Sequence, residues 1–216
     1  NPDAPVVAVG CYAQLAPEAV AALAGVSLVI GTDGRRDVVR LVEEAAAAGR
    51  AAPRSTVRPY GAACTFESLS AVADGRTRAT LKIQDGCNNF CTYCVIPYTR
   101  GRIRSLPPDE MARQAAHLAE EGYRELVLTG IEIASYGRDL PGTLTLADAV
   151  ETVAAAAPQM RLRLGSIEPT VITEDFCRRA AATGQVCRHF HLSLQSGCDR
   201  TLARMNRKYT TAEFLA

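Results

Sequence analysis

From about residue 77 onward, the chain alternates apolar segments with amphipathic segments of helical spacing. The apolar segments predict strands at residues 79–84, 125–129, 161–166 and 189–194. Helices are predicted at residues 107–121, 145–157, 173–184 and 199–205. Repeated strand–helix units indicate a parallel sheet. We therefore expect an α/β fold, a complete or partial (β/α) barrel, with its chemistry on the loops at the carboxyl ends of the strands.

The first 50 residues repeat this alternation on a smaller scale. Two short apolar strands are each followed by a helix, and the second helix is predicted to end at Gly49. The next stretch is rich in proline and glycine and has little periodicity. We therefore predict an α/β segment at residues 1–50, a linker at residues 51–76 and a truncated barrel domain at residues 77–216.

Three cysteines, Cys87, Cys91 and Cys94, lie in one eight-residue window directly after the first predicted barrel strand. Their spacing is C-x3-C-x2-C, and the aromatic Tyr93 precedes the last of them. A 4Fe–4S cluster normally takes four thiolates. Three thiolates would leave one iron with an open coordination site, and an open site distinguishes catalytic from structural metal centres.

Three other interpretations of these cysteines are open. A structural zinc site needs a fourth Cys or His close by, and the nearest histidine is His117, on a predicted helix. A disulfide framework is typical of small secreted chains. Free thiols can also be buried as small apolar side chains. The close spacing favours the cluster over all three.

Composition narrows the class of protein. Of the 216 residues, 48% are hydrophobic and 22% are charged, which is ordinary for a globular chain. The apolar runs are too short or too broken by charge to predict a membrane span, and no signal peptide is visible. Eight cysteines in such a chain indicate a reducing compartment, so we expect a cytoplasmic protein.

The charged residues are informative at one place in the sequence only, directly after the cysteine window. The net charge of +1 does not indicate a nucleic-acid binder. Arg100, Arg102 and Arg104, however, follow the cysteine window closely. Such a cluster either holds phosphates or is a solvated surface stretch.

The cysteine window resembles the signature of the radical S-adenosylmethionine (SAM) superfamily. Residues 81–91 and 96–101 are similar to the methylthiotransferases within that superfamily. The strand ends at residues 129–132 and 166–169 are most similar to the branch that acts on N6-threonylcarbamoyladenosine (t6A) in tRNA. The resemblance implies a partial radical SAM barrel, preceded by the C-terminal part of the family's α/β N-terminal domain.

The resemblance also implies a SAM site beside the cluster. SAM offers an amino group, a carboxylate and a ribose diol, which need acceptors and a cation, and the polar strand ends supply such residue types. Alone, each is as often a helix cap or a surface group. The expected SAM-binding residues are Gly130, Glu132, Glu168, Gln195 and Arg207, with Tyr93 against the bound nucleoside.

Residues 9–14 resemble the end of the family's N-terminal domain, which holds a second, auxiliary 4Fe–4S cluster on three cysteines. Cys11 matches the third of these. The other two would lie before residue 1, so we expect a fragment with incomplete auxiliary-cluster ligands. The remaining cysteines match no ligand and are expected to be buried apolar side chains; they are Cys64, Cys177, Cys187 and Cys198.

The implied function is a tRNA methylthiotransferase. One electron from the cluster would split SAM, and the resulting 5′-deoxyadenosyl radical would remove hydrogen from C2 of t6A, just 3′ of the anticodon. The implied partners are the anticodon loop of tRNA and a reductase as electron donor, with no membrane. The alternatives are a methylthiotransferase for isopentenyladenosine or for a ribosomal-protein aspartate, and a non-catalytic iron–sulfur or zinc protein.

Overall fold

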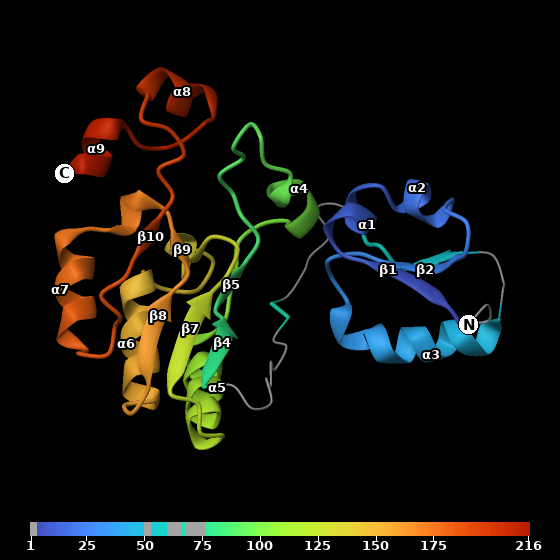
Figure 1. Ribbon diagram of the computed structural model, residues 1–216, viewed down its shortest axis with the longest axis horizontal. Helices are drawn as coiled ribbons and strands as arrows, with labels where there is room; N and C mark the ends of the chain where they lie inside the picture. Colours follow the sequence, from blue (N-terminus) through green and yellow to red (C-terminus); the bar gives the residue numbers. More distant parts are fainter. Residues whose placement is uncertain (1–3, 50–52, 60–65, 68–76) are drawn as a thin grey trace. The chain divides into compact units, whose positions relative to one another are not determined.

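The computed structural model describes residues 4–49, 53–59, 66–67 and 77–216. The chain divides into two compact units (Figure 1). The first comprises Asn1–Leu69 and Val95–Gly101, and the second comprises Ser70–Cys94 and Arg102–Ala216. Directly after the last cysteine of the window, the chain therefore returns to the first unit for one short segment. Most of the predicted linker lies outside the described residues.

The first unit is a parallel sheet with helices on both faces (Figure 1). Its strands, in spatial order, are β1 (Val6–Val9), β2 (Val26–Ile30) and β3 (Arg54–Ser55). Its helices are α1 (Cys11–Leu15), α2 (Pro17–Ala21), α3 (Val38–Ala48) and α4 (Ile96–Arg100). β3 lies within the segment predicted as linker.

Alternation along β2 explains the two-sided packing of this unit. Val29 packs with Ala13 and Val20 of the α1–α2 side. Leu28 and Ile30 instead pack with residues of α3. Successive strand residues point to opposite faces, so a continuous apolar strand needs a helix on each side.

The second unit contains the barrel-type sheet. Strands β4 (Arg78–Lys82), β7 (Glu125–Thr129) and β8 (Arg161–Leu164) are parallel and lie in that order. Beyond β8, the short strands β9 (Ser166–Ile167) and β10 (His191–Leu192) form a second parallel pair. A small antiparallel pair, β5 (Gln84–Asp85) and β6 (Arg104–Ser105), brackets the cysteine window in sequence.

Helices of the second unit follow the strands, as the sequence predicts. Those beside the sheet are α5 (Pro108–Glu120), α6 (Leu146–Ala156) and α7 (Glu174–Ala182), and those near the C-terminus are α8 (Asp199–Arg204) and α9 (Thr211–Leu215). Short 3₁₀ turns occur at Arg35–Asp37, Ile133–Ser135 and Pro169–Val171. The predicted α/β fold with a parallel sheet is confirmed. None of the described helices is long and apolar enough to cross a membrane.

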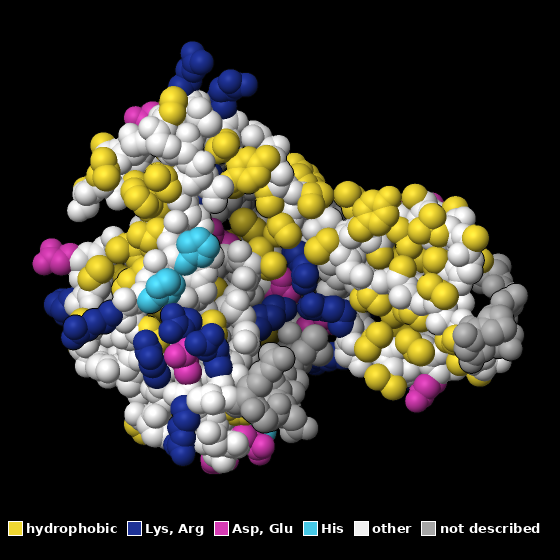
Figure 2. Space-filling model, in the orientation of Figure 1, with side chains coloured by type: hydrophobic (Ala, Val, Ile, Leu, Met, Phe, Trp, Pro, Cys, Tyr) yellow, Lys and Arg dark blue, Asp and Glu magenta, His cyan; other side chains and the backbone are white. Residues whose placement is uncertain are grey.

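The two faces of the β4–β7–β8 sheet differ in chemistry. One face is apolar and fully buried; its side chains are Ala79, Leu81, Leu126, Leu128, Leu162 and Leu164. On the other face Glu125 forms an ion pair with Arg78 at 2.6 Å and accepts a hydrogen bond from Arg163 at 2.8 Å. Figure 2 shows dark blue side chains around a magenta one in this region, below the cyan histidines.

Candidate functional site

The cysteine window leaves β5 and forms an irregular loop at the carboxyl ends of the strands. The thiols of Cys87, Cys91 and Cys94 are all partly buried. The Cys87 sulfur accepts a hydrogen bond from the Asn89 backbone N–H at 3.4 Å, and the Cys94 N–H donates to the Cys91 carbonyl at 2.9 Å. Burial raises the pKa of the Cys87 thiol. These are soft sulfur donors held on one short segment.

Gln84 fixes the start of this loop. Its side chain is fully buried. The amide nitrogen donates to the carbonyls of Asp85 and Gly86 at 2.9 and 2.8 Å, and the amide oxygen accepts from the N–H groups of Ile131 and Glu132 at 3.1 and 2.7 Å. One buried side chain therefore joins the cysteine loop to the loop that follows β7.

The close contact between the cysteine loop and the loop after β7 also requires a glycine at position 130. A Cβ at Gly130 would lie 2.7 Å from the Gln84 carbonyl oxygen. A contact that short forces the backbone to move. The structure therefore gives the predicted site residue Gly130 a packing role, because it lets the two backbones meet.

Two predicted site residues, Glu132 and Glu168, are brought together by the loop itself. The Asn89 amide nitrogen donates to a carboxylate oxygen of each, at 3.1 Å for Glu132 and 3.2 Å for Glu168. Burial, together with the nearby Glu168 carboxylate, raises the pKa of Glu132 to about 7. Two acidic acceptors thus share one donor beside the cysteines, an arrangement that favours an incoming cation.

Arg207 connects this carboxylate pair to the cysteines from a distant part of the sequence. Its guanidinium lies 3.2 Å from the Glu168 carboxylate, with both side chains 7% exposed, and it donates to the Cys91 sulfur at 3.4 Å. It also lies over the Tyr209 ring, 5.1 Å from the centroid. The Tyr209 hydroxyl donates to the carbonyls of Ser193 and Leu194, just after β10.

The other predicted SAM-binding residues lie further from this network. Tyr93 is 55% exposed, at the surface of the loop. Gln195 is exposed and has a φ of 66°, in the left-handed region. Cys11, the expected auxiliary-cluster ligand, begins α1 in the first unit and is partly buried.

Several residues that complete the site were not predicted from the sequence: Gln84, Asn89, Asn206 and Tyr209. Asn89 lies inside the cysteine window, and a polar residue between metal-ligand candidates is a signal that could have been used. Gln84 closes a buried strand, and a buried amide needs partners for both its ends. Asn206 reaches the loop, and Tyr209 reaches the carbonyls after β10, only through the tertiary fold.

The prediction that the remaining cysteines are buried is partly wrong. Cys187 is buried, whereas Cys177 and Cys198 are exposed. Cys177 lies on the solvent side of the amphipathic helix α7, and Cys198 precedes the first turn of α8, where backbone N–H groups lower its thiol pKa. Both places are set by tertiary packing, which the thiol's own hydrophobicity does not decide. Cys64 lies outside the described residues.

The three arginines after the cysteine window do not form one uniform patch. Arg104 is 15% exposed and lies 3.6 Å from the buried Asp85 carboxylate, which also contacts Lys82 at 2.5 Å. Arg100 ends α4 in the first unit, and Arg102 begins the return to the second and is exposed. Of the three, Arg102 fits the phosphate-binding interpretation best.

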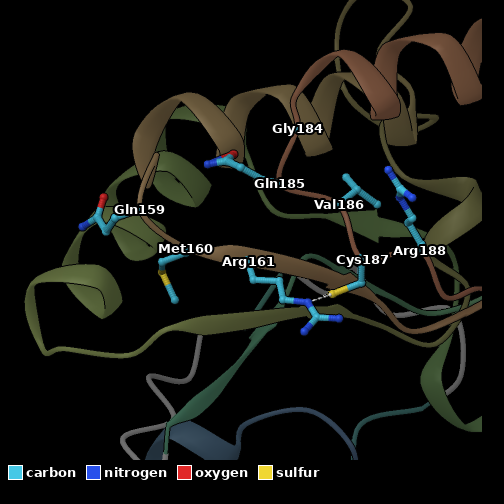
Figure 3. Close-up of a pocket in the computed structure, with 8 residues that line it drawn as sticks. All are labelled: Gln159, Met160, Arg161, Gly184, Gln185, Val186, Cys187 and Arg188. Atoms are coloured by element: carbon cyan, nitrogen blue, oxygen red, sulfur yellow. Dashed lines mark hydrogen bonds between the residues drawn. The ribbon is translucent and has the colours of Figure 1, made fainter.

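A cavity of about 450 Å³ lies at the other end of β8 (Figure 3). In it the Arg161 Nε donates to the Cys187 sulfur at 2.7 Å. Because β8 begins at Arg161 and runs toward Glu168, this cavity and the cysteine site are at opposite ends of the sheet.

The residues of the loop fit a 4Fe–4S cluster in their chemistry. They supply three thiols, and N–H donors of Asn89 and Arg207 already face two of the sulfurs. Such donors stabilise the thiolate form that binds iron. Among the described residues, no three His, Cys, Asp or Glu side chains converge as ligands of one metal ion would. Cluster thiolates bind separate irons and need not converge in that way.

Comparison with known proteins identifies the family. A model of the radical SAM superfamily matches residues 81–216. A Bacillus subtilis (strain 168) protein named "Threonylcarbamoyladenosine tRNA methylthiotransferase MtaB" is 38% identical over 100% of this chain, which covers 48% of that protein. A "tRNA-2-methylthio-N(6)-dimethylallyladenosine synthase" from Syntrophobacter fumaroxidans is 35% identical, with 97% of this chain and 46% of that protein covered. The chain spans about half the length of the curated relatives it matches.

A solved structure agrees at the level of the fold. The radical SAM methyltransferase TsrM from Kitasatospora setae, with cobalamin and a 4Fe–4S cluster bound, superposes with a TM-score of 0.65 at 15% identity. The match covers 97% of this chain and 47% of that one. With a family model that matches well over half of its residues, the chain belongs to the radical SAM superfamily, whose members use a 4Fe–4S cluster and SAM.

Proposed function

We propose that the protein is a tRNA methylthiotransferase that adds a methylthio group to C2 of t6A, just 3′ of the anticodon. The observation that carries the proposal is the link between the three-cysteine loop and the Glu132–Glu168 carboxylate pair through Asn89. The family match adds the radical chemistry, and the similarity to the B. subtilis relative adds the substrate.

In this proposal Cys87, Cys91 and Cys94 hold the cluster. When bound there, the cluster would supply the one-electron reduction of SAM on which the family's radical chemistry depends. The chain's own residues orient that chemistry. Asn89 sets the separation of the two carboxylates, and Arg207 holds both Glu168 and the Cys91 sulfur.

Glu132 and Glu168 are assigned the amino group of SAM. Both are acceptors, and both lie beside the cysteines at the carboxyl ends of strands. With a pKa near 7, Glu132 is poised to lose its proton when a cation arrives, because a nearby positive charge favours the ionised form. Tyr93, exposed on the same loop, is assigned a face of the bound nucleoside.

The remaining parts of the proposal concern groups outside this site. Cys11 is assigned to an auxiliary 4Fe–4S cluster that supplies sulfur. A reductase is the expected electron donor. Arg102 is assigned a phosphate of the anticodon loop, because it is the exposed member of the arginine cluster. A tRNA substrate places the reaction in the cytoplasm.

Mass spectrometry of nucleosides tests the substrate directly. In total tRNA from a strain that lacks the gene, we expect the methylthio derivative of t6A to disappear while unmodified t6A accumulates. The methylthio derivative of isopentenyladenosine should be unchanged, and the gene supplied in trans should restore the lost nucleoside. An intact methylthio-t6A peak in the deletion strain would refute the assignment.

The second candidate is a methylthiotransferase for isopentenyladenosine. It is favoured by the 35% identity to the S. fumaroxidans synthase, which is close to that of the t6A relative. The same nucleoside measurement separates the two candidates. Selective loss of the isopentenyl product would establish this second function in place of the first.

A further inference from the structure

The segment that follows α8 lies along the cysteine loop, although more than a hundred residues separate the two in sequence. The Asn206 amide nitrogen donates to the carbonyl oxygens of Asn89 at 3.1 Å and Phe90 at 3.0 Å. Both carbonyls belong to the stretch between Cys87 and Cys91. The Asn206 amide nitrogen, which carries two N–H donors, therefore donates to two carbonyls of the loop backbone.

Neighbours of Asn206 extend this contact along the loop. The Thr92 N–H donates to the Met205 carbonyl at 3.2 Å, and its hydroxyl donates to the Arg204 carbonyl at 3.1 Å. Arg207 donates to the Cys91 sulfur at 3.4 Å. Residues 204–207 thus form hydrogen bonds with the loop from Asn89 to Thr92. We call residues 204–207 the brace.

Backbone conformation shows why the loop needs an external partner. Phe90 has a φ of 48° and Asn206 a φ of 59°, both in the left-handed region. Asparagine tolerates that region comparatively well, whereas a bulky aromatic residue does not. Phe90 is 39% exposed, at the surface of the loop. The Asn206 hydrogen bond to the Phe90 carbonyl acts on this strained residue itself.

We propose that Asn206 is a positioning residue that holds the cysteine loop in the conformation that accepts and retains the cluster. It binds no iron and no SAM in this account, and it acts only through the carbonyls of Asn89 and Phe90. The inference rests on the proposed function to the extent that Cys87, Cys91 and Cys94 are taken as the cluster ligands. It adds that the site is completed from the end of α8.

Two substitutions in the full-length protein distinguish the role of the Asn206 side-chain amide from the role of the left-handed backbone conformation at that position. Asn206→Asp keeps the shape of the side chain but replaces the donor with a second acceptor that faces two carbonyls. Asn206→Gly keeps access to positive φ and removes the side chain. The control is Asn88→Asp, which makes the same charge change in the loop. Asn88 accepts from the Ile103 N–H at 3.3 Å, and an aspartate can still accept there.

The main readout is the rate of iron loss to a chelator after anaerobic reconstitution. Two lost hydrogen bonds predict about a tenfold faster loss in both Asn206 variants, with wild-type rates in Asn88→Asp. The electron paramagnetic resonance signal of the reduced cluster should also change shape in Asn206→Asp. A general loss of stability would lower the amount of signal and leave its shape unchanged.

A second readout uses the protein without iron, so it does not depend on reconstitution. Alkylation of Cys91 should become faster in both Asn206 variants, relative to the exposed Cys198 of the same molecule. Wild-type iron retention in Asn206→Gly would overturn the inference, because the left-handed turn alone would then suffice. So would unchanged Cys91 alkylation. Failure of the wild type to take up iron would instead count against the proposed function.

Discussion

Glu132 is the residue whose ionisation the site changes most clearly. Burial, with Glu168 nearby, raises its pKa from 4.5 to about 7. In the unfolded chain the carboxyl ionises at the lower value, so between pH 4.5 and 7 the folded protein binds more protons than the unfolded one. Stability must then fall as pH rises through that window. A tenfold change in proton affinity is worth about 1.4 kcal/mol, so a shift from 4.5 to about 7 contributes at most about 3.5 kcal/mol.

Replacement of Glu132 by Gln tests this directly. A glutamine at this position can still accept the hydrogen bond from the Asn89 amide. It cannot bind a proton, so its contribution to the pH dependence of stability is lost. We expect the free energy of unfolding of the iron-free protein to decrease from pH 5 to pH 7 more steeply in the wild type than in Glu132→Gln. Urea unfolding at several pH values measures the difference. Parallel curves for the two proteins would contradict the assigned pKa.

Asn89 shows what the sequence could and could not give at this scale. The cysteine spacing predicted which thiols hold the cluster. The polar strand ends predicted that Glu132, Glu168 and Arg207 lie beside it. The structure brings these three together. The amide that bridges the two carboxylates was not predicted, because nothing in the local sequence says which way a loop side chain turns.

Among the secondary-structure elements, β5 and the loop that follows β7 are linked by the side chain of Gln84. The Gln84→Leu substitution would leave the N–H groups of Ile131 and Glu132 and the carbonyls of Asp85 and Gly86 without that partner. Each buried group left without a hydrogen bond costs about 1–3 kcal/mol. We therefore expect a loss of at least about 3 kcal/mol in the free energy of unfolding, measured by urea titration.

The control for this change is Gln159→Leu, which makes the same substitution at an exposed glutamine on the cavity wall. Its effect should stay within about 0.5 kcal/mol, as for ordinary surface positions. Equal effects of the two substitutions would show that the Gln84 bonds do not link β5 to the loop that follows β7.

Elements with strong local signals were predicted well. Thr173 caps α7, at the residue where this helix was predicted to begin. Gly49 ends α3, as predicted. The short helices α1 and α4 and the β5–β6 pair were not predicted. Each is too short to show a periodicity, and each is defined by contacts that the fold supplies. In α4, for example, the Thr99 carbonyl accepts a hydrogen bond from the Thr32 hydroxyl at 2.5 Å.

The fourth predicted strand shows that the hydrophobic pattern of the sequence does not fix the length of a strand. Residues 189–194 read as one strand, but β10 comprises only His191 and Leu192. The chain then turns so that Tyr209 can donate to the carbonyls that follow. β10 therefore ends two residues before the end of the predicted strand.

At the scale of the whole molecule, the domain prediction assumed a single passage from one part to the next. By its contacts, Val95–Gly101 groups with the first unit directly after Cys94, and the division at residues 50 and 76 stays a prediction. No periodic signal marks this return in the sequence. The last cysteine thus ends the second unit's loop at the point where the chain changes units.

We propose that Cys87, Cys91 and Cys94 hold a cluster that cleaves SAM. The direct measurement is the yield of 5′-deoxyadenosine from the reconstituted full-length protein with SAM and a reductant under anaerobic conditions. We predict formation of 5′-deoxyadenosine by the wild type and by Cys177→Ala, an exposed control, and none by Cys91→Ala. Undiminished 5′-deoxyadenosine from Cys91→Ala, or a colourless wild-type protein that contains zinc and releases none, would contradict the claim.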